Sequence, residues 1–193
     1  ETSSNNDTAV VVFPVYCQNI PAPVKSFLKK MSAKHIVLIA TYGKISYGNV
    51  LYEAQQIVHG EIIAGAYIPM SHTFLDEDYT FDTRHLSSIV DRIKAPQKVQ
   101  IPKTRKNLLS NIFPALRSRI GVKLTKTDHC NNCGLCETLC PMLAIQNGRI
   151  HLECIRCLRC VTNCPQKALQ HKNRWILKKY LKSYHKEEYV LFL

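Results

Sequence analysis

The sequence lacks any long hydrophobic run. The longest uninterrupted aliphatic stretch is 36–40 (IVLIA), whereas a helix that crosses a bilayer needs about 20 apolar residues. The pattern therefore predicts no membrane-spanning helix and, by default, a cytoplasmic location. The first residue is Glu1 and not Met, so we expect a processed chain or a fragment of a longer parent.

Two common catalytic patterns are also missing. No GxGxxG occurs, which argues against direct oxidation of NAD(P)H. The eight histidines form no HExxH motif and no other paired ligand spacing. We therefore predict no catalytic residue in this chain.

Cysteine, in contrast, is concentrated in one segment. The segments CNNCGLCETLCP at 130–141 and CIRCLRCVTNCP at 154–165 repeat one pattern with a displacement of 24 residues. Ala144 and Gln146 recur as Ala168 and Gln170, which predicts two copies of a half-module related by a pseudo-twofold axis. Such spacing indicates metal ligation in a reducing, intracellular setting and not a disulfide framework. The ninth cysteine, Cys17, is interpreted as a spare thiol in a loop.

The spacing favours iron-sulfur clusters over zinc. Zinc knuckles use two separated Cys-x-x-Cys pairs, whereas each copy here has three successive cysteines and then a Cys-Pro. Three thiolates on a tight loop can wrap one side of a cubane, and the fourth ligand then comes from the Cys-Pro of the opposite copy. This predicts cluster one on Cys130, Cys133, Cys136 and Cys164, and cluster two on Cys154, Cys157, Cys160 and Cys140.

Residues 125–171 resemble the two-cluster bacterial ferredoxins. The resemblance implies an α+β ferredoxin-like module with two 4Fe-4S clusters that carries single electrons at low potential, in an anaerobic setting. Leu158 stands where the first copy has Gly134, which predicts altered loop geometry around cluster two. Arg156 and Arg159 lie between the cysteines of the second copy, and we expect both side chains to point into water and to make cluster two the easier one to reduce.

The first half of the chain has the pattern of an α/β sheet. Runs at 9–13, 36–40 and 61–68 are apolar without alternation, which is typical of parallel strands buried on both faces. Helical spacing of apolar residues falls between and after them, at 24–31, 50–58 and 86–93. We therefore predict the order β-α-β-α-β-α in an open parallel sheet.

The loops that follow the first two strands are PVYCQNIP at 14–21 and TYGKISYG at 41–48. With the closing iron-sulfur module, they resemble the flavodoxin-ferredoxin fusion proteins. That resemblance implies a partial flavodoxin-like sheet, with the flavin ring of FMN contacted by Tyr16, Thr41, Tyr42 and Gly43. Alternatively, Tyr16 and Tyr42 only cap the core.

The family strand order 2-1-3-4-5 would make these runs strands three to five and leave the first one with an unpaired edge. No phosphate loop precedes them. We therefore expect FMN in the full-length parent and weak or no FMN binding by this chain.

The predicted organisation has four parts. They are a partial flavodoxin-like domain at 1–97, a basic linker and helix at 98–124, a two-cluster 4Fe-4S ferredoxin domain at 125–175, and a C-terminal helix and tail at 176–193. Within them, the linker centres on 94–106, an apolar helical stripe spans 109–120 although Pro114 interrupts it, and the last helix covers 174–185.

The charge is unevenly distributed. The formal net charge is +12, and 92–127 contains ten lysines and arginines but no acid. The segment 165–186 also lacks acids. We expect a redox partner protein that is acidic at its docking surface, because charge steers transient encounters. Nucleic acid ranks below it for want of a recognised motif, and docking to a membrane surface through 107–124 and 174–193 is a third alternative.

The predicted function is electron transfer, with single electrons relayed between FMN in the complete parent and a redox partner. The alternative is an iron-sulfur subunit or maturation factor of a larger oxidoreductase.

Overall fold

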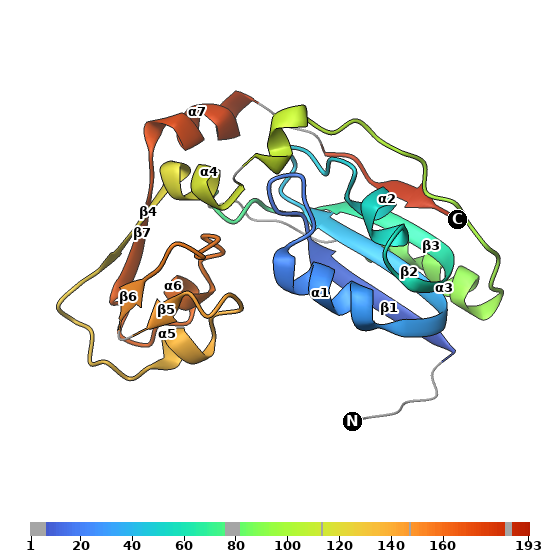
Figure 1. Cartoon of the computed structure of the whole chain (residues 1–193). Coiled ribbons are helices and arrows are strands. Elements are labelled where there is room, and N and C mark those ends of the chain that lie inside the picture. Colours follow the sequence, from blue (N-terminus) through green and yellow to red (C-terminus); the bar gives the residue numbers. More distant parts are fainter. Residues whose placement is uncertain (1–6, 76–81, 113, 147, 184–186) are drawn as a thin grey trace. The chain divides into compact units, whose positions relative to one another are not determined.

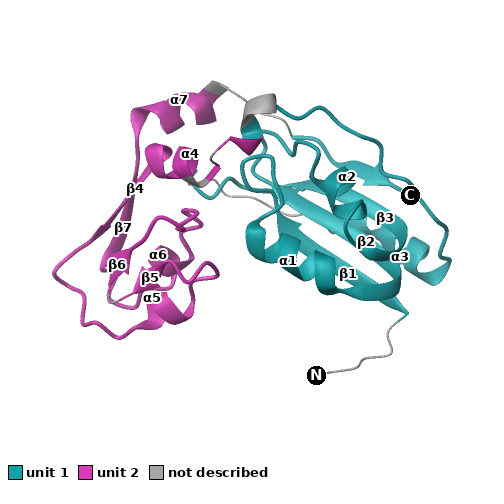
Figure 2. Cartoon of the chain, viewed as in Figure 1, with its two compact units in different colours: residues 1–110, 186–193 teal, residues 111–185 magenta. Residues whose placement is uncertain are grey.

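The computed structural model describes residues 7–75, 82–112, 114–146, 148–183 and 187–193. The chain divides into two compact units, which Figure 2 shows in different colours. Unit 1 comprises residues 1–110 and 186–193, and unit 2 comprises residues 111–185. In the described part of the chain, no helix is long and apolar enough to cross a membrane.

Unit 1 is built around a four-stranded sheet with the spatial order β1-β2-β3-β8 (Figure 1). Strands β1 (Thr8–Pro14), β2 (Ser32–Tyr42) and β3 (His59–Pro69) are parallel, and β8 (Val190–Phe192) pairs antiparallel with β3. The helices are α1 (Ala22–Lys30), α2 (Val50–Gln55) and α3 (Ser87–Lys94), with the 3-10 turn η1 (Thr83–Leu86) before α3. The predicted β-α-β-α-β-α order is confirmed.

The central strand β2 is buried on both faces. Ile36, Leu38 and Ala40 belong to the apolar cluster that contains Leu28 of α1 and Leu51 of α2. The alternate residues Val37 and Ile39 belong to a second cluster, together with Ile89 of α3. Successive side chains of a strand point to opposite faces, so a strand covered by helices on both sides needs an unbroken apolar run.

The edge strand β1 is covered on one face only. Val11 and Phe13 pack in the cluster beneath α1 and α2, whereas Val10 and Val12 are 49% and 60% exposed. Among the described residues, β1 pairs with β2 alone. The expected unpaired edge at the first strand is therefore present.

The predicted linker is attached to unit 1. Residues 95–107 contain no helix or strand, but Ile101 is buried, and Gln55 donates to its carbonyl (2.7 Å) and accepts from its N–H (3.0 Å). The Val99 N–H donates to the Ile62 carbonyl at 2.8 Å. The segment thus binds the core of unit 1. Lys98, Lys103 and Arg105 are exposed, whereas Lys106 forms an ion pair with Glu53 at 2.7 Å.

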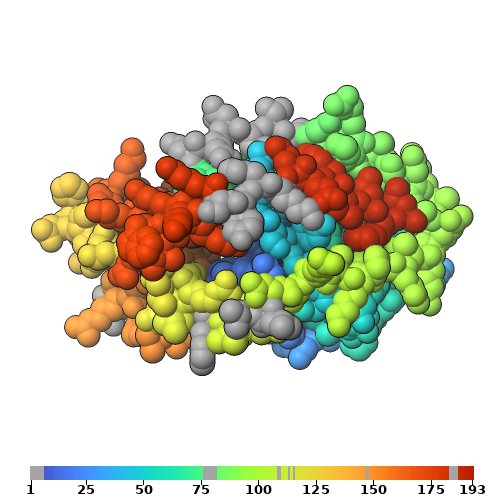
Figure 3. Space-filling model, turned by 90° about the horizontal axis from the view of Figure 1, so that it is seen from above, coloured from blue at the N-terminus to red at the C-terminus, as the bar shows by residue number. Residues whose placement is uncertain are grey.

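The end of the chain returns to unit 1. After α7 (Trp175–Ser183), which forms where a helix was predicted, β8 joins the sheet beside β3. The Tyr42 hydroxyl donates to the Glu188 carbonyl at 2.8 Å, and Lys44 forms an ion pair with Glu187 at 3.0 Å. Figure 3 shows this red segment against the green and cyan surface of unit 1. Strand β8 was not predicted from the sequence, because a strand of three residues is too short to show a periodic pattern.

Unit 2 contains two small antiparallel ribbons. Strand β4 (Val122–Lys126) pairs with β7 (Leu169–Asn173), and β5 (Ile145–Gln146) pairs with β6 (Arg149–Ile150). The short helices α5 (Leu135–Thr138) and α6 (Arg159–Thr162) lie in the two cysteine segments. Helix α4 (Pro114–Gly121) follows the 3-10 turn η2 (Leu108–Asn111) and begins at the proline, which fits a first helical turn.

Candidate iron-sulfur site

The two cysteine segments follow the same backbone path. Left-handed φ angles, which are uncommon for residues other than glycine, occur in pairs displaced by the 24 residues of the repeat. The pairs are Asn132 and Arg156 (57° and 58°), Gly134 and Leu158 (76° and 60°), and Leu143 and Lys167 (50° and 50°). The prediction that Leu158 alters the geometry of the second loop is therefore wrong, because Leu158 has the same left-handed backbone conformation as Gly134. The Leu158 side chain is buried at 4% exposure, and packing holds it in this conformation.

Hydrogen bonds link each copy to the other. Thr127, before the first loop, donates its N–H to the Ala168 carbonyl at 2.8 Å, and His151, before the second loop, donates to the Ala144 carbonyl at 2.9 Å. These two bonds correspond under the 24-residue displacement. The predicted pseudo-twofold relation is thus present in the backbone, and each copy is hydrogen-bonded to the other at corresponding positions.

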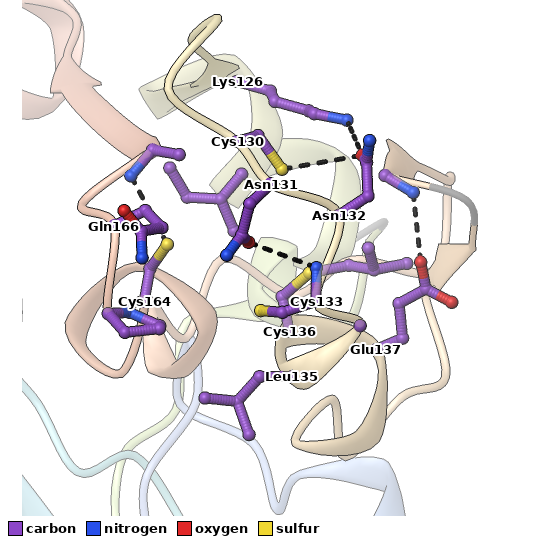
Figure 4. Close-up of a pocket in the computed structure, with 16 residues that line it drawn as sticks. Lys126, Cys130, Asn131, Asn132, Cys133, Leu135, Cys136, Glu137, Cys164 and Gln166 are labelled. Atoms are coloured by element: carbon purple, nitrogen blue, oxygen red, sulfur yellow. Dashed lines mark hydrogen bonds between the residues drawn. The ribbon is translucent and has the colours of Figure 1, made fainter.

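Four of the predicted ligands line one cavity. The cavity has a volume of about 350 Å³, and its lining includes Cys130, Cys133 and Cys136 of the first loop together with Cys164 of the second (Figure 4). This volume lies at the lower end of the range for cofactor sites, which is about 300–1,000 Å³. The structure therefore brings together the four cysteines predicted for cluster one.

The thiols surround this cavity and do not meet at a point. In the part of the chain that the structure describes, no group of three or more His, Cys, Asp or Glu side chains converges so as to hold a single metal ion. A zinc site needs four ligands at about 2.0–2.3 Å from one ion, whereas each thiolate around a 4Fe-4S cluster binds a different iron.

The cysteine before each proline accepts a backbone hydrogen bond. The Ala168 N–H donates to Sγ of Cys164 at 3.3 Å, and the Ala144 N–H donates to Sγ of Cys140 at 3.2 Å. Desolvation raises the pKa of Cys164, but the N–H groups of Leu169, Ala168, Gln166 and Lys167 outweigh it and lower that pKa overall. The repeated alanines noted in the sequence thus mark donors to the cross-copy thiols.

The thiols inside the loops are in a different environment. Burial, followed by the charges of Cys154 and Cys157, raises the pKa of Cys160 to about 11. Burial also raises the pKa of Cys136, with Glu137 as the second cause. Such thiols must lose their protons to bind iron, so cluster assembly on them would release protons.

The cysteine at the centre of the second predicted ligand set is Cys160, which has neighbours in both loops. The charge of Cys160 is coupled to those of Cys154 and Cys157, its partners in the second loop. Cys136 and Cys140 of the first copy both pack against the small apolar cluster of Ile145, Cys160 and Leu169. Cys160 thus lies near Cys140, its predicted partner, and near Cys136, which was predicted for cluster one.

The residues implied as flavin contacts lie at one edge of the unit 1 sheet. Tyr16 exchanges two backbone hydrogen bonds with Asn19 in the loop after β1, and the Val15 N–H donates to the Thr41 carbonyl at 2.7 Å. Tyr42, in contrast, is only 2% exposed and lies edge-on to Tyr47, with 5.1 Å between ring centroids.

Gly43 lies directly against His72, which a Cβ at this position would meet. Tyr16 and Gly43 thus lie in the loops that follow β1 and β2, and Thr41 is the last residue but one of β2, at the carboxyl edge where open α/β sheets bind ligands. Tyr42 is a core residue.

Comparison with known proteins agrees with the first cysteine loop. The family model described as the 4Fe-4S binding domain matches residues 125–146. No curated protein and no solved structure matches the chain. The chain therefore contains a 4Fe-4S-binding, ferredoxin-like module, which supports an iron-sulfur electron-transfer role.

Proposed function

We propose that this protein is an electron carrier with two 4Fe-4S clusters, each bound by three cysteines of one loop and the Cys-Pro cysteine of the other. The observation that carries the proposal is the cavity in which Cys164 of the second loop joins Cys130, Cys133 and Cys136 of the first. The backbone repeat extends the same arrangement to Cys154, Cys157, Cys160 and Cys140.

The arrangement suits transfer of single electrons. One cysteine of each loop, Cys133 or Cys157, is exposed, so each cluster would lie close to the surface and within reach of a docked partner. Clusters of this kind accept and release one electron without bond breakage at the ligands. The chain supplies the position of each cluster and the charges around it.

The test is anaerobic reconstitution followed by iron and sulfide analysis. We expect about eight irons per chain, since two clusters hold four each. Cys164→Ser should reduce the iron bound by the first loop, and Cys140→Ser the iron bound by the second. Cys17→Ser is the matched control, because Cys17 lies in unit 1 and should leave iron content unchanged. Bound zinc without charge-transfer absorbance would contradict the proposal, and about four irons would limit it to one cluster.

FMN forms the second part of the proposal, as the donor or acceptor of electrons in the complete parent. Its support is the position of Tyr16, Thr41 and Gly43 at the carboxyl edge of the parallel sheet. Tyr42 does not contribute a ring contact, since it is buried and its hydroxyl bonds Glu188. We expect weak FMN binding by this chain, since its 193 residues contain no recognised phosphate loop. Fluorescence titration of FMN measures the affinity, and tight binding would show that the pocket lies elsewhere.

An acidic redox partner fits the charges of the β4–β7 ribbon. Lys123 lies directly opposite Lys172 in the antiparallel register, and both side chains are exposed. Like charges across a strand pair are unfavourable, so an anionic partner would be attracted to this ribbon.

Replacing both lysines by glutamine should slow electron transfer from an acidic donor such as a reduced flavodoxin, and should weaken its salt dependence. Lys29→Gln in α1 is the control, since that lysine is an exposed residue of unit 1. Unchanged rates would contradict the partner assignment. Tight binding to nucleic acid or anionic vesicles would favour those alternatives, and a stable complex with other subunits would favour a subunit or maturation factor of a larger oxidoreductase.

A further inference from the structure

Arg156 lies in the middle of the second cysteine loop, and its side chain turns inward. Its Nε donates to the backbone carbonyl of Val122 at 3.2 Å. Val122 is fully buried at the start of β4. The Nη1 atom is also buried, and within the described residues it has no hydrogen-bond partner. The expectation that this guanidinium points into water is therefore wrong.

The first loop has no arginine at the corresponding position. The Lys126 ammonium lines the cavity of that loop, but it is exposed to solvent. Asn132 occupies the corresponding position with the same left-handed backbone, and its side-chain oxygen accepts from Lys126 Nζ at 3.0 Å, at the surface. In the second loop, Arg159 is adjacent to Cys160 but exposed. Of these two arginines, Arg156 is thus the one whose side chain is partly buried.

No carboxylate lies within ion-pair distance of Arg156 in the described part of the chain. Burial of a charge without a partner of opposite sign is costly. A 4Fe-4S cluster with four thiolate ligands is anionic, so a cluster on Cys154, Cys157, Cys160 and Cys140 would supply the missing charge.

We propose that the inward-facing guanidinium of Arg156 raises the reduction potential of the cluster bound by the second loop above that of the first, so that electrons enter the second loop's cluster first. This inference rests on the proposed two-cluster function. In the step concerned, a low-potential one-electron donor transfers one electron to the oxidised core, which passes from [4Fe-4S]²⁺ to [4Fe-4S]⁺. No bond at the four thiolates is made or broken, and no proton moves.

Arg156 and Arg159 are both positively charged, so the expected difference between them comes from where each charge lies. Reduction adds one negative charge, which a nearby fixed positive charge stabilises. A guanidinium remains protonated throughout the pH range in which proteins fold. Water and salt screen an exposed charge much more than one removed from solvent. Arg156 should therefore affect the potential much more strongly than Arg159, although both are next to ligands in the sequence.

The experiment is an EPR-monitored redox titration of the reconstituted full chain, with dithionite as the reductant. We expect two midpoints in the wild type. Arg156→Gln should lower the higher midpoint and leave the lower one in place. Arg159→Gln, the matched control, should shift the same midpoint much less, and Arg156→Lys should restore most of the loss.

A structural role alone would not give this pattern, since it would change iron content and leave the midpoints of the remaining clusters in place. If Arg156→Gln fails to assemble, the wild type still decides. Its separation between midpoints should largely persist from low to about 1 M salt, because salt screens a partly buried charge less than an exposed one.

Coincident midpoints in the wild type, a separation that disappears in salt, or equal effects of the two glutamine variants would overturn the proposal. Iron content near four per chain would instead contradict the two-cluster function on which it rests.

Discussion

Unit 1 and unit 2 differ in the interactions that stabilise each of them internally. In unit 1, two apolar clusters cover both faces of one sheet, with fully buried residues such as Leu28, Leu38 and Ile63. In unit 2, the apolar cluster around the cysteines contains three buried residues, Ile145, Cys160 and Leu169. Small domains with so little core are commonly stabilised by metals or disulfides. The difference teaches that unit 1 folds by burial of apolar surface, whereas unit 2 depends on what its cysteines bind.

Removal of iron gives the largest expected difference between the units. Anaerobic chelation should expose the backbone amides of β4 to β7 to exchange, because metal binding and folding are coupled when a core is small. The amides of β2 and β3 should keep their protection, since their core needs no ligand. Hydrogen exchange measured by mass spectrometry gives both in one sample. Equal loss of protection in the two units would refute the comparison.

A cavity in the core of unit 1 should have the opposite effect, because it should destabilise unit 1 and leave the iron site of unit 2 intact. Leu38 is fully buried in the centre of β2, so Leu38→Ala should lower the free energy of unfolding of unit 1 by about 2–5 kcal/mol. Iron content and visible absorbance should be unchanged, because the loss lies outside unit 2. Denaturant unfolding followed by circular dichroism and by cluster absorbance separates the two effects. A variant that loses iron would show that the units do not fold independently.

A single polar group in the core of unit 1 has a smaller effect. The Tyr67 hydroxyl accepts the N–H of Leu51 in the first turn of α2 at 2.9 Å, and both residues are buried. Tyr67→Phe leaves that N–H without a partner and should cost about 1–3 kcal/mol. Chemical denaturation measures the loss, and Tyr52→Phe is a control on the same helix.

Tyr67 also predicts how unit 1 responds to alkali. Burial raises the pKa of Tyr67 to about 12 from its usual value of 10.0. A tyrosine with a raised pKa stabilises the fold at lower pH, and this contribution is lost as the pH rises from about 10 toward 12. Unit 1 should therefore lose stability over that interval, and Tyr67→Phe should reduce the dependence. A pH profile that is the same in wild type and variant would contradict this cause.

The smallest effect concerns the two cysteine loops. Gly134 has φ of 76°, and a Cβ placed there would meet nothing within 4 Å. Gly134→Ala should therefore cost only the backbone strain of the left-handed conformation, roughly 1–2 kcal/mol. Thermal loss of the cluster absorbance measures this change. No measurable effect would mean that the first loop accommodates a side chain as readily as the second accommodates Leu158.

Local sequence patterns were sufficient to predict those features that depend on residues of a single segment. The apolar runs predicted β1, β2 and β3, because a strand between two helical layers must be apolar on both faces. Cysteine spacing predicted the set that lines the cavity, because the same spacing recurs with the same left-handed φ angles. Contacts between distant segments were not predictable. Tyr42 was expected beside a flavin, but its hydroxyl binds the backbone of Glu188, which is 146 residues away.

The sequence by itself determined the parallel sheet, the twofold repeat and the cysteine groups, since each depends on residue spacing within one segment. Only the tertiary structure decided that the last strand returns to unit 1 and that Arg156 turns inward to Val122 while Arg159 stays in water. Both arginines look alike in the sequence because their neighbours are cysteines in each case. Their surroundings differ because Val122 lies 34 residues away along the chain, and only folding brings its carbonyl to the side chain.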